Sequence, residues 1–227
     1  MSAELQSQFE RSYQEQQATQ RAQIKALQSQ INPHFLNNTL EIINWEARMA
    51  DNDRVSAMIE ALSTMLSASL DRDGRAQIPL REELGYVDAY LYIIRERLGE
   101  KFQVYQQIDQ TLMDQMIPRL ILQPIVENAV EHDITARRGG NLWVRVQRDA
   151  TRMILEVEHD GTMTEADREK IDLLLSESYT DGGRVGLRNV HQRMKLIYGD
   201  ESSLRVTQTD HGTVMAQMIF PLEENRG

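Results

Sequence analysis

The residues with the clearest chemical potential lie between Gln30 and Leu40, in the segment Q-I-N-P-H-F-L-N-N-T-L. His34 follows Pro33 directly, and Asn38 comes one helical turn after His34, on the same side. An imidazole of ordinary pKa, about 6.5, is largely neutral in the cell, so its lone pair can attack phosphorus. The simpler interpretation is a helix start, with Asn32 as the cap, Pro33 in the first position and His34 in the first turn.

A second segment, Leu122 to His132, reads L-Q-P-I-V-E-N-A-V-E-H. On an α-helix Asn128 and His132 are four residues apart and therefore stacked. The amide oxygen of Asn128 can bind Mg²⁺, a cation that prefers oxygen ligands and keeps several waters. The Glu127 carboxylate can accept a proton or hold one of those waters. Taken alone, the segment would by default be interpreted as a polar helix face in water.

A third segment, Gly182 to Arg193, reads G-G-R-V-G-L-R-N-V-H-Q-R. Glycines just before a helix let backbone N–H groups approach phosphate, and the helix N-terminus adds a partial positive charge. Arg188 and Arg193 add cationic side chains. Because a glycine-containing turn before a helix is more often a plain loop, this segment indicates a phosphate site only together with the other two.

The composition limits the classes of protein to which the chain can belong. With 41% apolar and 26% charged residues, it is typical of a soluble globular protein. The net charge of −10 argues against nucleic acid as a partner, and the absence of cysteine excludes disulfides. No apolar run approaches the roughly 18 residues of a membrane helix, and the start is not a signal peptide. The abrupt, Gln-rich start predicts that the chain is the soluble part of something longer.

Apolar residues recur at three- and four-residue spacing around His34, which predicts that it lies on a helix. A second apolar stripe, from Met58 to Leu70, predicts the other arm of a helical hairpin, which should stop at Asp71–Gly74. Asn52 or Asp53 is expected to cap this second arm. Because two helices alone cannot bury both stripes, we expect the hairpin to dimerise into a four-helix bundle.

The second half alternates between helical and two-residue periods. A helix from Ile78 to Leu98 should be followed by a strand starting at Phe102. Further strands are predicted at residues 142–146, 153–157, 203–207 and 213–220, and further helices at residues 118–132, 164–178 and 187–198. Thr164 and Asp167 form a possible capping box. Strands in hairpins and clustered helices predict an α+β fold rather than a doubly wound sheet.

The order of the three segments resembles the bacterial sensor histidine kinases of the LytS/YehU/YesM type. The resemblance covers about residues 21 to 222 and includes a histidine motif at residues 30–40, an N box at residues 122–132 and a last glycine box at residues 186–193. It implies an α+β protein in which an N-terminal dimerising helical hairpin precedes a Bergerat (GHKL) ATP-binding α/β sandwich. The implied regions are a signalling coiled-coil helix (1–30), a dimerisation and phosphotransfer hairpin (31–75), a linking helix (76–100) and a catalytic ATP-binding domain (101–227).

The resemblance also implies a function within a two-component system. ATP would phosphorylate His34, and the phosphoryl group would pass to an aspartate of a response regulator. The implied catalytic residues are His34, Glu127 and Asn38, and Asn128 would hold Mg²⁺. The residues implied to bind ATP are Asn128, His132, Asp160, Gly161, Gly183, Gly186, Leu187 and Arg188. A homodimer is implied, as the cytoplasmic portion of a sensor that reaches the membrane only through a segment outside this chain.

The first glycine box departs from the family pattern D-x-G-x-G, whose aspartate reads the adenine amino group. Here residues 159–163 read H-D-G-T-M, so His159 stands in place of that aspartate and Met163 in place of the second glycine. Either Asp160 reads the base from a shifted turn or nucleotide affinity is weak. Asp133 follows His132 where glycine is usual, and its negative charge near the phosphates would not help ATP to bind.

Other functions fit parts of this pattern. The altered glycine box favours a degenerate kinase that acts as a dimeric scaffold or phosphatase-type regulator with weak nucleotide binding. A Bergerat ATPase with chaperone-like action would leave the setting of His34 unexplained. The five histidines show no paired-ligand spacing, so a histidine metal site is not expected.

Overall fold

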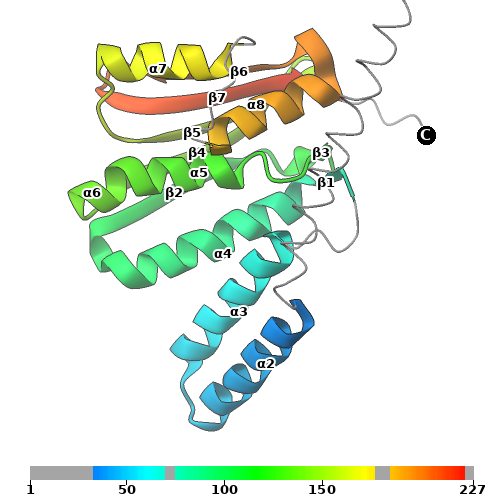
Figure 1. Cartoon of the computed structure of the whole chain (residues 1–227), viewed down its shortest axis with the longest axis vertical. Helices are drawn as coiled ribbons and strands as arrows, with labels where there is room; N and C mark the ends of the chain where they lie inside the picture. The colour runs from blue at the N-terminus through cyan, green and yellow to red at the C-terminus, as the bar shows by residue number, and fades with distance from the viewer. Residues whose placement is uncertain (1–32, 70–74, 177–184, 223–227) are drawn as a thin grey trace, which may run out of the picture. The chain divides into compact units, whose positions relative to one another are not determined.

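The structure is a computed structural model that describes residues 33–69, 75–176 and 185–222 (Figure 1). It divides into two compact units, Met1–Ile59 and Glu60–Gly227, which are described separately. None of the helices in the described ranges combines the length and the apolar character needed to cross a membrane. The predicted coiled-coil helix at residues 1–30 and the helix stop at Asp71–Gly74 lie outside the described residues.

The first unit contains the first arm, the turn and the start of the second arm of the predicted helical hairpin. Its arms are α2 (Pro33–Met49) and the first part of α3 (Asp53–Ser69). Asn52 caps the second arm as predicted, because its Oδ1 accepts a hydrogen bond of 3.2 Å from the backbone N–H of Val55. The Ser56 hydroxyl donates to Oδ1 of Asn44 across the turn, so a polar contact joins the two arms.

Much of the apolar surface of α2 remains exposed in the single chain. Phe35, Ile42, Trp45 and Met49 each expose more than half of their surface, with values of 65%, 64%, 69% and 74%. Exposed apolar patches of this kind mark surfaces that contact another protein.

The second unit is built on a five-stranded sheet with the order β2-β4-β5-β7-β6. Its strands are β2 (Phe102–Ile108), β4 (Gly140–Asp149), β5 (Arg152–Asp160), β6 (Ser203–Gln208) and β7 (Thr213–Pro221). The β2–β4 pair is parallel and the other pairs are antiparallel. A separate antiparallel pair joins β1 (Gln77–Pro79) to β3 (Met116–Pro118). The α+β class predicted from the sequence is confirmed.

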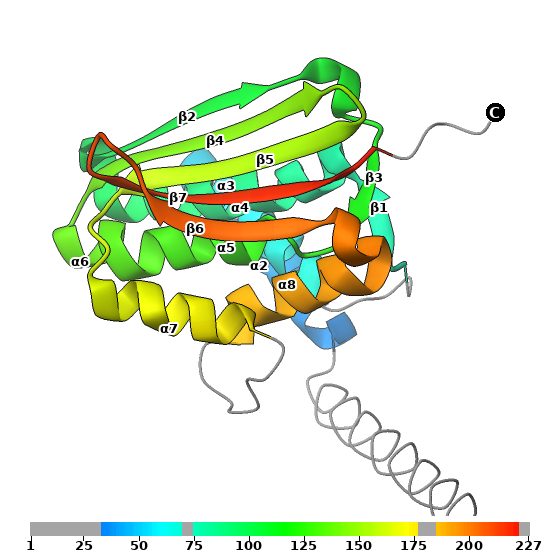
Figure 2. The same cartoon turned by 90° about the horizontal axis from the view of Figure 1, so that it is seen from above.

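Helices cover one face of the sheet, as Figure 2 shows. They are α4 (Leu80–Leu98), α5 (Gln123–Ala129), the π-helix η3 (Val130–Ile134), α6 (Thr135–Arg137), α7 (Glu165–Leu175) and α8 (Val185–Tyr198). Single 3-10 turns follow α4, β2 and α8 as η1 (Gly99–Lys101), η2 (Gln110–Leu112) and η4 (Gly199–Glu201). The helix predicted from Pro118 begins only at Gln123, because Pro118 belongs to strand β3.

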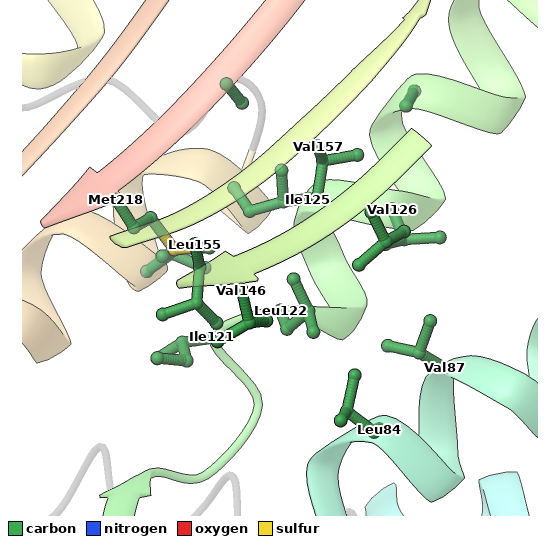
Figure 3. Packing of buried hydrophobic residues seen from close by; sticks show 14 of the residues in the cluster. Leu84, Val87, Ile121, Leu122, Ile125, Val126, Val146, Leu155, Val157 and Met218 are labelled. Atoms are coloured by element: carbon green, nitrogen blue, oxygen red, sulfur yellow. The ribbon is translucent and has the colours of Figure 1, made fainter. Parts of the chain in front are cut away.

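The core lies between the sheet and these helices (Figure 3). Alternate residues of β5, including Leu155 and Val157, point toward the helices and meet Ile125 and Val126 of α5. Burying each such side chain contributes about 1.5–3 kcal/mol. His159 occupies the next inward position of β5 after Val157, so the core leads directly to the site described below.

A buried carboxylate fixes the start of α5. Glu83 of α4 is fully buried, and its oxygens accept hydrogen bonds from the backbone N–H groups of Leu120 (2.9 Å), Leu122 (3.0 Å) and Gln123 (3.3 Å). Burial raises the pKa of the Glu83 carboxyl, and the backbone N–H groups oppose part of this rise. Leu120 adopts a φ of 56°, a conformation that this set of hydrogen bonds holds in place.

The same loop is also joined to two other helices. The Arg119 guanidinium donates to the carbonyl oxygens of Ser67 (3.1 Å) and Ala68 (2.7 Å), near the end of α3. Arg193 of α8 donates to the carbonyl oxygens of Arg119 and Leu120. The loop before α5 is therefore held by α3, α4 and α8 together.

Candidate functional site

A cavity of about 270 Å³ lies between the inner face of the sheet and the helices α5, η3, α7 and α8. Its apolar lining includes Ile125, Ala129, Val157, Ile171, Val214 and Ala216. Its polar lining consists of Asn128, Asp133, His159, Thr162 and Asp167. A hollow that combines apolar walls with a few placed polar groups is typical of a small-molecule site.

His159 enters the cavity because it lies on the inward face of β5. Its residue is only 7% exposed, and its Nδ1–H donates to the carbonyl oxygen of Asp160 at 3.3 Å. Burial lowers the pKa of the His159 imidazole, and the Asp133 carboxylate, whose Oδ2 lies 3.6 Å from Nδ1, opposes part of this fall. His159 is therefore neutral at neutral pH.

Asp160 faces the other side of the strand and does not line the cavity. One of its carboxylate oxygens accepts hydrogen bonds from both the backbone N–H and the side-chain amide of Asn141, each at 2.8 Å. This placement differs from the prediction that Asp160 reads the base. Successive residues of a strand point to opposite faces, so His159 and Asp160 cannot both face the cavity.

A π turn changes the register of the helix that carries Asn128. The backbone N–H of Thr135 donates to the carbonyl of Val130, five residues earlier. Asn128 and Asp133, also five residues apart, both line the cavity. The prediction that Asn128 stacks with His132 required α-helical spacing throughout this segment. The side chain of His132 lies outside the described residues.

Two glycines of the predicted site lie against these side chains. A Cβ atom on Gly161 would lie 3.0 Å from both the Asp133 carboxyl carbon and Cε1 of His159. A Cβ atom on Gly186 would lie 3.5 Å from Nδ2 of Asn128, so the last glycine box meets the N box. Leu187 lines the cavity, whereas Arg188 does not. Gly183 lies outside the described residues.

Glu127 does not line the cavity but is held from within its own helix. The buried side-chain amide of Gln123 donates a hydrogen bond of 2.8 Å to a Glu127 oxygen. Gln123 was not among the residues predicted for the site. The signal was available, because residues four apart on a helix are neighbours.

The predicted capping box of α7 is confirmed. The Thr164 hydroxyl accepts from the backbone N–H of Asp167, while the Asp167 carboxylate accepts from the backbone N–H of Thr164. Although Asp167 lines the cavity, its carboxylate therefore caps the N-terminus of α7.

In the first unit, His34 and Asn38 lie beside one another on α2. The side-chain Nδ2 of Asn38 is 3.3 Å from Nδ1 of His34, and both residues are exposed. The one-turn spacing read from the sequence therefore brings the carboxamide to the imidazole.

Comparison with known proteins identifies the family. Residues 22–102 match the family model described as "Histidine kinase", and residues 113–224 match that of the "Histidine kinase-, DNA gyrase B-, and HSP90-like ATPase". The chain belongs to the sensor histidine kinase family. The resemblance stated from the three sequence motifs is thus confirmed.

Curated relatives of this chain are about one third identical to it. Sensor histidine kinase YpdA of Escherichia coli is 33% identical over 88% of this chain and 34% of its own length. Sensor histidine kinase YesM of Bacillus subtilis is 31% identical over 90% of this chain and 34% of its own length. YwpD of Bacillus subtilis is 33% identical over 93% of this chain and 74% of its own length. The chain thus spans about 34% of the length of the sensor kinases YpdA and YesM.

Among solved structures, the catalytic domain of histidine kinase ThkA is similar to this chain, with a TM-score of 0.50 and 17% sequence identity. The match covers 64% of this chain and 94% of the ThkA domain. At this identity the likeness shows a shared fold. It agrees with the α+β sandwich implied by the sequence resemblance.

The side chains around the cavity can be compared with what a magnesium ion needs. Within the described residues, no group of three or more His, Asp and Glu side chains could hold a metal ion by itself. Mg²⁺ in phosphate-binding sites typically takes one or two protein ligands, with waters and substrate oxygens supplying the rest. Asn128, which lines the cavity next to Gly186, offers one amide oxygen of this kind.

Proposed function

We propose that this protein is an ATP-dependent protein-histidine kinase that phosphorylates His34 and passes the phosphoryl group to an aspartate of a response regulator. The observation that carries the proposal is the cavity beside Asn128, in a chain where a histidine kinase region precedes an ATPase region. The cavity supplies a nucleotide site, and α2 supplies an imidazole in the matched histidine kinase region.

The carboxamide of Asn38 can prepare His34 for this reaction. In the structure Nδ2 of Asn38 faces Nδ1; when the carboxamide turns over so that its oxygen accepts from Nδ1–H, the proton is held on Nδ1 and the lone pair remains on Nε2. Nε2 then bonds to the γ-phosphorus while the bond from that phosphorus to the bridging oxygen breaks, and ADP leaves. A second transfer moves the phosphoryl group from Nε2 to an aspartate oxygen of the response regulator.

Phosphoryl transfer depends mainly on positioning and on neutralising charge. We assign Asn128 to hold Mg²⁺, which neutralises phosphate charge when it is bound with ATP. Glu127 is assigned to order a metal-bound water or to polarise the attacking imidazole. His132, Arg188, Gly183 and Gly186, the last of which lies in the first turn of α8, are assigned to the phosphates.

The exposed apolar side chains of α2 support a homodimer, in which the hairpins of two chains form a four-helix bundle. We also propose that the chain is the cytoplasmic portion of a membrane sensor, attached through a segment outside this sequence. Relatives named as sensor proteins, and their greater length, support this arrangement.

Incubation with γ-labelled ATP and Mg²⁺ tests the kinase. We expect a protein-bound phosphate that is labile in acid and stable in base, lost in His34→Ala and retained in His211→Ala. Labelling that persists in His34→Ala would show that another residue is the acceptor.

The alternative of a scaffold with weak nucleotide binding is favoured by one observation, the presence of His159 in the cavity. Titration with a fluorescent ATP analogue separates the two functions. Micromolar binding supports the kinase, whereas absent binding together with an intact dimer supports the scaffold.

A further inference from the structure

Three aspartates lie in or beside the cavity, and they differ in whether their acceptor oxygens are used. Asp160 is bound to Asn141, and Asp167 is bound to Thr164. Among the described residues, the nearest polar partner recorded for the Asp133 carboxylate is Nδ1 of His159, and the 3.6 Å separation exceeds a hydrogen bond. Asp133 therefore presents unused acceptor capacity to the cavity.

The surroundings of Asp133 fit a flat ring with a polar edge. Ile125 and Ala129 line the cavity from α5, while Val157 lines it from β5. The cavity volume of about 270 Å³ lies near the lower end of the range for small-molecule sites, about 300–1,000 Å³. Such walls bury an aromatic ring, and a carboxylate at its edge selects a ring that donates a hydrogen bond.

His159 leaves the Asp133 carboxylate available. Because burial lowers the pKa of the imidazole, His159 is neutral and does not neutralise Asp133 as an ion pair. Its Nδ1–H is directed to the Asp160 carbonyl oxygen, so Nε2 is a second acceptor. Two acceptors close together favour a ligand group that carries hydrogens, such as an amino group.

Gly161 makes this arrangement possible. A Cβ atom there would lie 3.0 Å from the Asp133 carboxyl group and from the His159 ring, closer than ordinary contact. The absence of a side chain lets Asp133 of the π turn lie beside His159 of β5. From the sequence, the Asp133 charge was predicted to lie near the phosphates. The structure instead places it beside the first glycine box, the segment expected to bind the base.

We infer that Asp133 is the residue that recognises the exocyclic amino group of adenine, from the π turn η3 instead of from strand β5. The carboxylate accepts a charge-assisted hydrogen bond from that amino group, and His159 lines the same end of the cavity. This inference rests on the proposed function, because it concerns the base of the ATP that the kinase uses.

The test compares the dissociation constants of ATP and of purine riboside triphosphate, which lacks the amino group, on the full chain with Mg²⁺. Because the ratio compares two nucleotides on one protein, it cancels general effects of a mutation on stability. We expect the wild-type chain to bind ATP about tenfold more tightly, as the loss of one charge-assisted hydrogen bond predicts. In Asp133→Ala the ratio should fall to near one, and in the control Asp172→Ala, an exposed aspartate of α7, it should stay near ten.

The possible outcomes distinguish a failure of this inference from a failure of the proposed function. If Asp133→Ala still binds ATP and the ratio of the two dissociation constants is unchanged, the role of Asp133 is overturned, but the proposed kinase function is not. If Asp133→Ala binds neither nucleotide, Asp133→Asn, which keeps the side-chain volume, decides: a lower ratio supports the inference and an unchanged one overturns it. A wild-type chain that binds no ATP overturns both, and tighter binding of GTP than of ATP overturns the assignment to adenine.

Discussion

The amide of Gln123 donates a hydrogen bond of 2.8 Å to the carboxylate of Glu127, one helical turn later on α5. Gln123 is itself only 5% exposed, and its backbone N–H is bound by Glu83. Glu127 is thus oriented by a side chain whose own position is fixed from α4. Gln123 acts as a positioning residue for the carboxylate assigned to catalysis.

Replacing Gln123 by Leu should slow autophosphorylation without weakening ATP binding. The hydrogen bond to a charged group contributes about 1.4 kcal/mol, so we expect a roughly tenfold lower kcat and a KM within twofold of wild type. Initial rates of label incorporation over a range of ATP concentrations measure both constants. Gln103→Leu, at an exposed position of β2, is the matched control. An unchanged kcat would remove Gln123 from the mechanism.

Glu83→Gln should destabilise the second unit by about 3 kcal/mol, because an amide cannot satisfy the backbone N–H groups that the buried carboxylate binds. Its sequence neighbour Glu82 provides the control. Glu82 pairs with Arg75 near the surface, so Glu82→Gln should cost less than about 1 kcal/mol. Urea unfolding measures both changes, and equal losses would contradict the special role of Glu83.

The stability of the protein should fall as the pH drops below about 6.5, the pKa of an unperturbed histidine. The folded pKa of His159 is lowered, mainly by burial, so in this range the unfolded chain binds the proton more readily than the folded one. His159→Asn should make the dependence of unfolding free energy on pH shallower between pH 7 and 5. Identical slopes in wild type and His159→Asn would refute this origin.

Gly139→Ala should be far more damaging than Gly199→Ala. Both glycines have positive φ, +148° and +58°. A Cβ atom on Gly139 would lie 2.5 Å from the carbonyl oxygen of Lys101, whereas nothing lies within 4 Å at Gly199. We expect losses of roughly 3 kcal/mol and 1 kcal/mol, respectively, in thermal or urea unfolding. A similar loss at both sites would show that the backbone near Lys101 moves aside.

The double substitution Ile42→Glu and Trp45→Glu should convert the proposed dimer to a monomer. Both residues are exposed apolar positions of α2, and charges placed in a dimer interface would be buried without partners. Light scattering after gel filtration should report half the wild-type mass. Leu196→Glu controls for added charge, since Leu196 of α8 is 86% exposed. A wild-type chain that is already monomeric would contradict the homodimer.

Local periodicity was sufficient to predict most of the elements. The helix predicted over residues 78–98 is found as α4 (Leu80–Leu98), and it buries the apolar face that its periodicity implies. The positions of the strands and the Thr164 capping box also follow from short-range patterns. These features depend on residues that are close in the sequence, so they can be predicted from the sequence alone.

Features that depend on distant contacts were not predicted. The helix expected from Pro118 starts later because Pro118 pairs in β3 and Glu83, some 40 residues earlier, binds the loop that follows. The π turn after α5 carries no recognisable local signal. It brings Asp133 into the cavity, while strand alternation turns Asp160 away.

The π turn has a practical consequence for reading related sequences. In a sequence alignment, His159 counts as the loss of the acidic residue usual at that position. In the structure, however, the carboxylate of Asp133, five positions after Asn128, lines the same cavity as His159. Homologues that lack aspartate in the strand but carry it at that five-residue offset would form a recognisable subgroup, and should be sorted by this pairing before any of them is labelled inactive.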